Sequence, residues 1–209
     1  MGLDTNSGSD KTYLSISEGR IAKRVEKGTE GAVECRSKDG SRIWYEKRYP
    51  SVTGRIVDVF KRSSDKGYGP QLCIVLEDIG EKFQVQMPWS SRYSSGFFLC
   101  MPNIDLSKSI TLAPWMKEID GQKKTMLYIR QGENNVDWYW TKDDPKGMPQ
   151  MVQVKVKGEI VWDDTDRQQF FEDYLSKVFI PKMEATVIGK TEKQAEPATD
   201  SQHEDDLPF

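Results

Sequence analysis

The sequence predicts a mainly β protein, built as a small barrel or sandwich of short strands. Over residues 12–130, glycine-containing turns separate short runs rich in β-branched and aromatic residues, and several of these runs alternate apolar with polar side chains. Asp39-Gly40 lies between two such runs and is a typical signal for a tight hairpin. The 209 residues suit one domain with appendages, or at most two small domains.

The first strands are short and follow a polar segment, residues 1–11, that we expect to be disordered. Strands are expected at residues 13–17, 20–25, 32–35 and 42–49. After Pro50 the runs lengthen, and strands are expected at residues 52–62, 71–77 and 82–87. Residues 67–70 and Ile79-Gly80 supply the turns between these longer strands.

Pro88 interrupts the strands, and residues 90–101 can form a short helix. Further strands are expected at residues 109–117, 124–130, 136–141 and 150–162. The clearest helix is residues 166–180, because its apolar side chains recur at three- and four-residue spacing. Thr165 can cap this helix and Pro181 ends it, which gives bounds of 165–181. Its apolar face either packs on the strands or binds another copy, and we favour packing.

Charge is distributed unevenly along the chain. The formal net charge is −3, but the residues after Met183 contain seven acids and two lysines, a local charge of −5. Residues 1–183 therefore hold 28 basic and 26 acidic side chains, a charge of +2. We expect one domain over residues 12–183 and a flexible acidic tail over residues 184–209. A mildly basic body with an acidic tail suits binding to nucleic acid.

The residue types that most enzymes need are scarce. The single histidine, His203, lies in the tail, and the chain has no phosphate-binding glycine loop or dinucleotide fingerprint. The three cysteines lack the paired spacing of a zinc site, so we expect neither a metal nor a cofactor. Adjacent acids such as Asp143-Asp144 leave a metal-dependent nuclease as the least excluded enzyme class. Unpaired cysteines, with no signal peptide and no membrane-spanning run, predict a cytoplasmic protein.

The last residues combine chemistry that is typical of a docking peptide. Glu204, Asp205 and Asp206 precede Leu207, Pro208 and the terminal Phe209. An aromatic ring beside a free carboxylate can fill an apolar pocket while a basic residue of the partner binds the carboxylate. This tip resembles that of bacterial single-stranded DNA-binding proteins, which end in acids, a hydrophobic residue, proline and phenylalanine.

The resemblance implies a fold, a function and partners. Such proteins coat single-stranded DNA without sequence specificity or catalysis during replication, recombination and repair, and recruit enzymes such as a polymerase, helicase or primase through the tip. The order strand, strand, strand, short helix, strand, strand over residues 52–130 also matches an oligonucleotide/oligosaccharide-binding (OB) barrel. The long N-terminal extension and short tether depart from the bacterial pattern. A bacteriophage-encoded relative, acting in the host cytoplasm, fits better and leaves the oligomeric state open.

Aromatic and basic residues interleave at several places in the body, as single-strand binding requires. The candidate nucleic-acid-binding residues are Trp44, Arg48, Lys61, Arg62, Lys66, Tyr68, Trp89, Arg92, Tyr93, Lys124, Tyr128, Arg130, Trp138 and Trp140. On residues 124–130 the alternation predicts a core face and a basic face with an exposed ring. Each ring has core packing as its alternative. An interaction adaptor that acts mainly through its tail is the alternative function.

Overall fold

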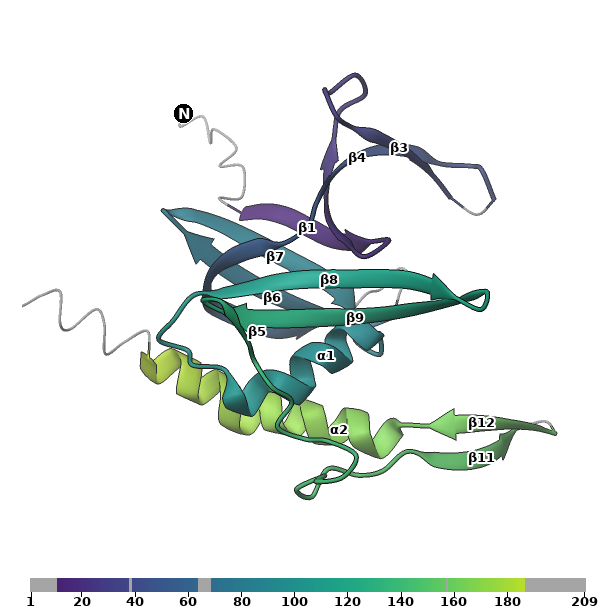
Figure 1. Ribbon diagram of the computed structural model, residues 1–209, viewed down its shortest axis with the longest axis vertical. Helices are drawn as coiled ribbons and strands as arrows, with labels where there is room; N and C mark the ends of the chain where they lie inside the picture. Colours follow the sequence, from purple (N-terminus) through teal and green to yellow (C-terminus); the bar gives the residue numbers. More distant parts are fainter. Residues whose placement is uncertain (1–10, 38, 64–68, 157, 187–209) are drawn as a thin grey trace, which may run out of the picture.

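The computed structural model describes residues 11–186 except residues 38, 64–68 and 157. These residues form a mainly β protein with one large, open sheet, a separate two-stranded ribbon and two helices (Figure 1). The strands of the large sheet are, in spatial order, β10 (Asn134–Asn135), β9 (Gln122–Gln131), β8 (Ile110–Ile119), β5 (Val52–Arg62), β6 (Gln71–Asp78), β7 (Glu81–Pro88), β1 (Lys11–Ser17), β2 (Arg20–Val25), β4 (Ile43–Tyr49) and β3 (Val33–Arg36). The β1–β7 pair is parallel and the other neighbouring pairs are antiparallel.

Two-residue turns set the register of three hairpins. Both turn residues have positive φ at Glu18-Gly19, Ile79-Gly80 and Asp120-Gly121. This is the conformation of a type I′ turn, whose twist matches the twist of the paired strands. Gly19 also packs tightly, because a Cβ there would lie 2.5 Å from the backbone nitrogen of Met116. The sheet therefore curls until the β1–β2 turn contacts β8.

Helix α1 (Arg92–Cys100) lies between β7 and β8 in the chain and packs against β9. Ser91 caps it by accepting a hydrogen bond from the Ser94 backbone N–H (3.1 Å). Gly96 permits the close approach, since a Cβ there would lie 3.0 Å from the Leu127 carbonyl oxygen. Phe97 and Phe98 are fully buried, so this helix fills the interior of the curled sheet.

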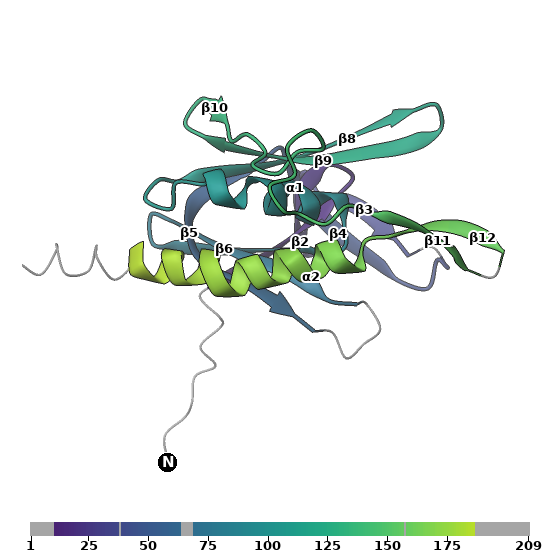
Figure 2. The same cartoon turned by 90° about the horizontal axis from the view of Figure 1, so that it is seen from below.

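Helix α2 (Thr165–Tyr174) continues through a π-helical segment, Leu175–Phe179, and then through residues 180–186. Figure 2 shows it running along the outside of the body. Its aromatic side chains pack inward: Phe171 stacks on Phe98 with ring centroids 5.0 Å apart, and Phe179 meets Phe97 at 5.8 Å. The apolar face of this helix thus joins the core, as the sequence predicts.

Three hairpins extend away from the core (Figure 1). They are β3–β4, the distal half of β8–β9, and the ribbon formed by β11 (Val152–Val156) and β12 (Glu159–Asp163). Within the described residues, no helix combines the length and the apolar composition that a membrane span requires.

Two strand predictions near the C-terminus are wrong. Residues 136–141 form a loop after the two-residue β10, because the Trp140 ring turns inward and packs on two rings of α2. Its ring centroid lies 4.8 Å from that of Tyr174 and 5.2 Å from that of Phe170. Residues 150–162 are not one strand: β11 and β12 pair with each other around Gly158. That glycine has a φ of +92° and forms part of the turn.

The predicted ends of the long helix also differ. Thr165 is the first helical residue and does not cap, because its N–H and hydroxyl donate to Asp163 Oδ1 (3.0 and 2.6 Å). Pro181 does not end the helix. The Ile180 N–H donates to the carbonyl oxygen of Leu175, five residues earlier. This wider π-helical turn directly precedes Pro181, which has no N–H to donate.

The predicted tight turn at Asp39-Gly40 is wider than a two-residue turn, because β3 ends at Arg36 and β4 begins at Ile43. The Ser37 N–H donates to the Arg42 carbonyl oxygen across the base of this loop (3.0 Å). Asp39 accepts hydrogen bonds from the Ser41 N–H and hydroxyl, and these local bonds stabilise the wider turn.

Candidate nucleic-acid interface

The β8–β9 hairpin has one buried side and one outward side. Ile110, Leu112, Leu127 and Ile129 are at most 1% exposed and belong to the core. Successive side chains in a strand point to opposite sides, so their neighbours face outward. We call the outward set the β8–β9 face; it consists of Thr111, Ala113, Trp115 and Lys117 on β8, and Lys124, Met126, Tyr128 and Arg130 on β9.

Two aromatic rings are exposed on the β8–β9 face. Trp115 is 38% exposed and Tyr128 is 39% exposed, both well above what is usual for a core aromatic. Met126 lies directly across from Trp115, and Ala113 lies across from Tyr128. The small alanine leaves the Tyr128 ring without a bulky cross-strand neighbour. The face therefore presents flat apolar surfaces on which planar groups can stack.

Three cations flank these rings. Lys117 and Lys124 lie directly opposite each other, and Arg130 lies opposite Thr111. Within the described part of the chain none of the three is in an ion pair, and the buried Nε of Arg130 has no hydrogen-bond partner. Like charges directly opposite in a sheet destabilise it. An anion between the lysines would remove this repulsion.

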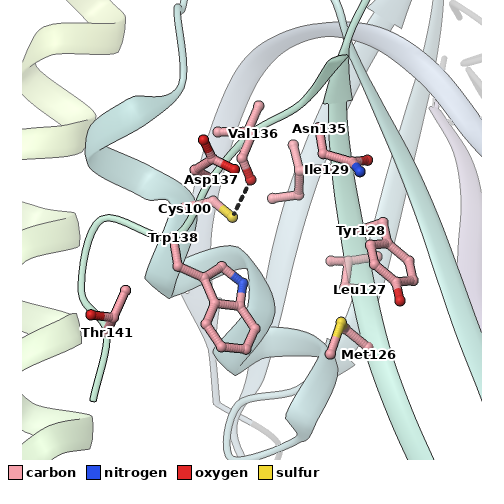
Figure 3. Close-up of a pocket in the computed structure, with 10 residues that line it drawn as sticks. All are labelled: Cys100, Met126, Leu127, Tyr128, Ile129, Asn135, Val136, Asp137, Trp138 and Thr141. Carbon is pink, nitrogen blue, oxygen red and sulfur yellow. Dashed lines mark hydrogen bonds between the residues drawn. The ribbon is translucent and has the colours of Figure 1, made fainter. Parts of the chain in front are cut away.

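The face continues into a hollow of about 370 Å³ between β9 and the loop of residues 135–141. Figure 3 shows Trp138 on the loop side, Tyr128 on the strand side and Met126 between them. The loop is attached to β9 by the Val136 N–H, which donates to the Ile129 carbonyl oxygen (2.8 Å). Trp138, 44% exposed, is therefore positioned beside the β8–β9 face.

Cys100 supports the same loop from the side of α1. Its thiol donates to the Val136 carbonyl oxygen (3.3 Å; Figure 3). Burial, assisted by the charge of Asp137, raises the pKa of the Cys100 thiol to about 12. The sulfur therefore keeps its proton and remains a hydrogen-bond donor at neutral pH.

Several residues that the sequence nominated lie together at this site. Tyr128 and Trp138 line the same hollow, while Lys124 and Arg130 share the β8–β9 face with Tyr128. The alternation predicted for residues 124–130 agrees with the burial of Leu127 and Ile129 and the exposure of Tyr128.

Two nominated tryptophans are core residues and cannot stack on a base. Trp89 is 4% exposed and lies 4.7 Å from Phe98, and Trp140 is 2% exposed among the aromatics of α2. Tyr93 is partly buried against the core. Lys61 lies over the Trp89 ring at 4.8 Å and pairs with Glu172 at 2.5 Å. These residues therefore do not belong to the candidate surface.

The N-terminal candidates also have partners within the protein. The Trp44 indole donates to Glu46 (2.6 Å), and Arg48 pairs with Glu18 (2.6 Å) and with Glu46 (3.7 Å). Two further candidates are exposed but do not line the hollow beside Trp138: Arg62 and Arg92. The remaining candidates lie outside the described residues: Lys66, Tyr68, Asp205, Asp206, Leu207, Pro208 and Phe209.

Sequence reasoning missed Trp115 and Lys117. The signal was present, since Ile110 and Leu112 alternate with Thr111 and Ala113 and this phase places Trp115 and Lys117 outward.

The described ranges contain no cluster of three or more His, Cys, Asp or Glu side chains that could bind a metal ion. Comparison of the chain with protein-family models, with curated proteins and with solved structures gave no match.

Proposed function

We propose that this protein binds single-stranded DNA through the β8–β9 face, without sequence specificity and without catalysis. The observation that carries the proposal is the alignment of Trp115 and Tyr128 with Lys117, Lys124 and Arg130 on one surface. Exposed rings stack on bases of any sequence, while cations bind the phosphates between them. From Lys124 to Arg130 this surface is about 20 Å long, enough for several nucleotides.

The strand order is compatible with an OB barrel. Strands β9, β8, β5, β6 and β7 are consecutive neighbours, and α1 joins β7 to β8 as the helix between the third and fourth strands would. In this proposal β1–β4 are an addition, because β7 pairs with β1 at its outer edge and the sheet grows to ten strands.

A second part of the proposal concerns the acidic tip, Asp205, Asp206, Leu207, Pro208 and Phe209. The tip recruits replication or recombination enzymes, with the Phe209 ring as its anchor and the acids as its electrostatic contacts. The support is the sequence chemistry: a terminal aromatic residue and a free carboxylate beside clustered acids.

Fluorescence polarisation with labelled oligo-dT of about 30 nucleotides tests the first part. We expect binding with little base preference and with affinity that falls as salt is added. Tyr128→Ala and Trp115→Ala should each weaken binding about 5- to 100-fold, the loss of one stacked base. The matched control is Tyr13→Ala, which removes a ring that is 51% exposed on β1. Equal losses in all three variants, or no binding at low salt, would contradict the proposal.

Removal of residues 204–209 tests the second part. Binding to oligo-dT should stay equal or rise, because less negative charge competes with the phosphates. Capture of a replication enzyme should be lost, and Phe209→Ala alone should reproduce that loss. If the intact body ignores nucleic acid while the tail still captures a partner, the protein is an adaptor instead.

A further inference from the structure

A second hollow, of about 380 Å³, lies next to the first. It is formed by the loop that carries Trp138, by the β11–β12 ribbon and by the start of α2. Among its lining residues, Trp140 and Met148 are buried, Trp138 and Trp162 are exposed, and Lys142 and Arg167 supply positive charge. The volume falls within the range of small-ligand sites.

The two hollows are adjacent. Trp138 and Thr141 line both of them, so Trp138 separates the hollow beside Tyr128 from the hollow beside Trp162. A strand that lies on the β8–β9 face and passes Trp138 therefore reaches the second hollow directly.

The ribbon itself is exposed to an unusual degree. Trp162 is 62% exposed and Ile160, two residues before it on the same side of β12, is 70% exposed. β11 and β12 pair only with each other in the described structure, and an isolated two-stranded hairpin is at best marginally stable in water. Tryptophan is usually largely buried, so the exposed ribbon has the character of an interaction surface.

We infer that this second hollow binds one nucleobase of the single strand, with Trp162 as a stacking residue; this inference rests on the proposed function. A base supplies the flat π surface that Trp138 and Trp162 can contact. Its phosphates remain outside, where Lys142 and Arg167 provide positive charge. The Arg167 side chain is anchored, because its Nε–H donates to the Pro149 carbonyl oxygen (3.1 Å).

The test compares Trp162→Ala, Trp162→Phe and Ile160→Ala with the wild-type chain. Ile160 is the matched control, since it is exposed on the same side of the same strand but does not line the hollow. With oligo-dT of about 30 nucleotides, Trp162→Ala should weaken binding about 5- to 100-fold, and Trp162→Phe should recover most of that loss. Ile160→Ala should bind like wild type.

The outcomes separate this inference from the proposed function. If wild type binds oligo-dT and Trp162→Ala binds equally well, the inference is wrong while the proposed function stands. If Ile160→Ala loses as much affinity as Trp162→Ala, the ribbon acts through its fold and the inference is also overturned. Light scattering without DNA adds a check. A wild-type dimer that Trp162→Ala converts to a monomer would assign the ribbon to contacts between copies instead.

Discussion

Two lysines face each other on the β8–β9 hairpin, and replacing one of them should make the protein more stable but weaken its binding to DNA. Lys117 and Lys124 are directly opposite in register, and neither has an ion-pair partner among the described residues. For ammonium groups about 6 Å apart in water, Coulomb repulsion is about 0.7 kcal/mol, and physiological salt reduces it to about 0.3 kcal/mol. Lys124→Gln should therefore raise the free energy of unfolding by about 0.3 kcal/mol.

The same change should weaken DNA binding. Each phosphate neutralised on a single strand contributes about 0.7 to the slope of log affinity against log salt. At about 0.1 M salt this term corresponds to a fivefold change in affinity. Lys124→Gln should thus bind oligo-dT about fivefold more weakly, with a salt slope that is shallower by about 0.7.

Urea unfolding and polarisation titrations at several salt concentrations measure both effects. The control is Lys123→Gln, because Lys123 lies on the other side of the strand, opposite Glu118. It should not gain stability and should leave the salt slope almost unchanged. The reasoning fails if Lys124→Gln destabilises the protein without weakening binding, or if Lys123→Gln changes the slope equally.

Three further predictions concern the framework of the site. In urea unfolding, Gly19→Ala should lower the free energy of unfolding far more than Gly121→Ala. Both glycines have φ near +70°, but only at Gly19 would the new Cβ collide, 2.5 Å from the Met116 backbone nitrogen. Similar losses in the two variants would contradict the packing of the β1–β2 turn on β8. Cys35 is partly exposed and should be the first thiol modified in the native protein, although slowly, because burial raises its pKa. Cys73 and Cys100 are buried and should react only after unfolding, which thiol titration with and without denaturant measures. Fast reaction of Cys100 in the native protein would rule out its buried hydrogen bond. Hydrogen bonds from Ser107 and Lys108 lower the pKa of Asp105 from 3.8 to about 2. The Asp105 carboxylate should therefore stabilise the fold above pH 3.8 and lose that effect as the pH falls toward 2. When the free energy of unfolding is measured between these pH values, Asp105→Asn should show less pH dependence than wild type, and an unchanged pH dependence would refute this role.

The sequence was most informative where one side of a strand is buried. From Val52 to Gln131 the predicted strands and helix correspond to elements of the structure, because alternating apolar residues and turn glycines act locally. The same local pattern was misleading at Trp138 and Trp140. Their spacing predicted a strand, but contacts between Trp140 and α2, about thirty residues later in the chain, determine the loop.

Long-range packing also explains the errors at the candidate site. Nothing near Trp89 in the sequence indicates that its ring packs on Phe98 and lies beneath Lys61. Conversely, the sequence pattern predicts that Trp162 belongs to one continuous strand, whereas the turn at Gly158 places it on an exposed ribbon. Exposure of individual rings depends on which elements meet in space, and the alternation within one strand does not determine that.

Ultraviolet cross-linking of oligo-dT to the full chain, followed by peptide mapping, tests the central claim most directly. The β8–β9 face should give cross-links at Trp115 or Tyr128, and Tyr128→Ala should lose those at residue 128 while its overall fold is retained. Cross-links confined to the β3–β4 hairpin, or none at low salt, would contradict the claim that this face binds single-stranded DNA.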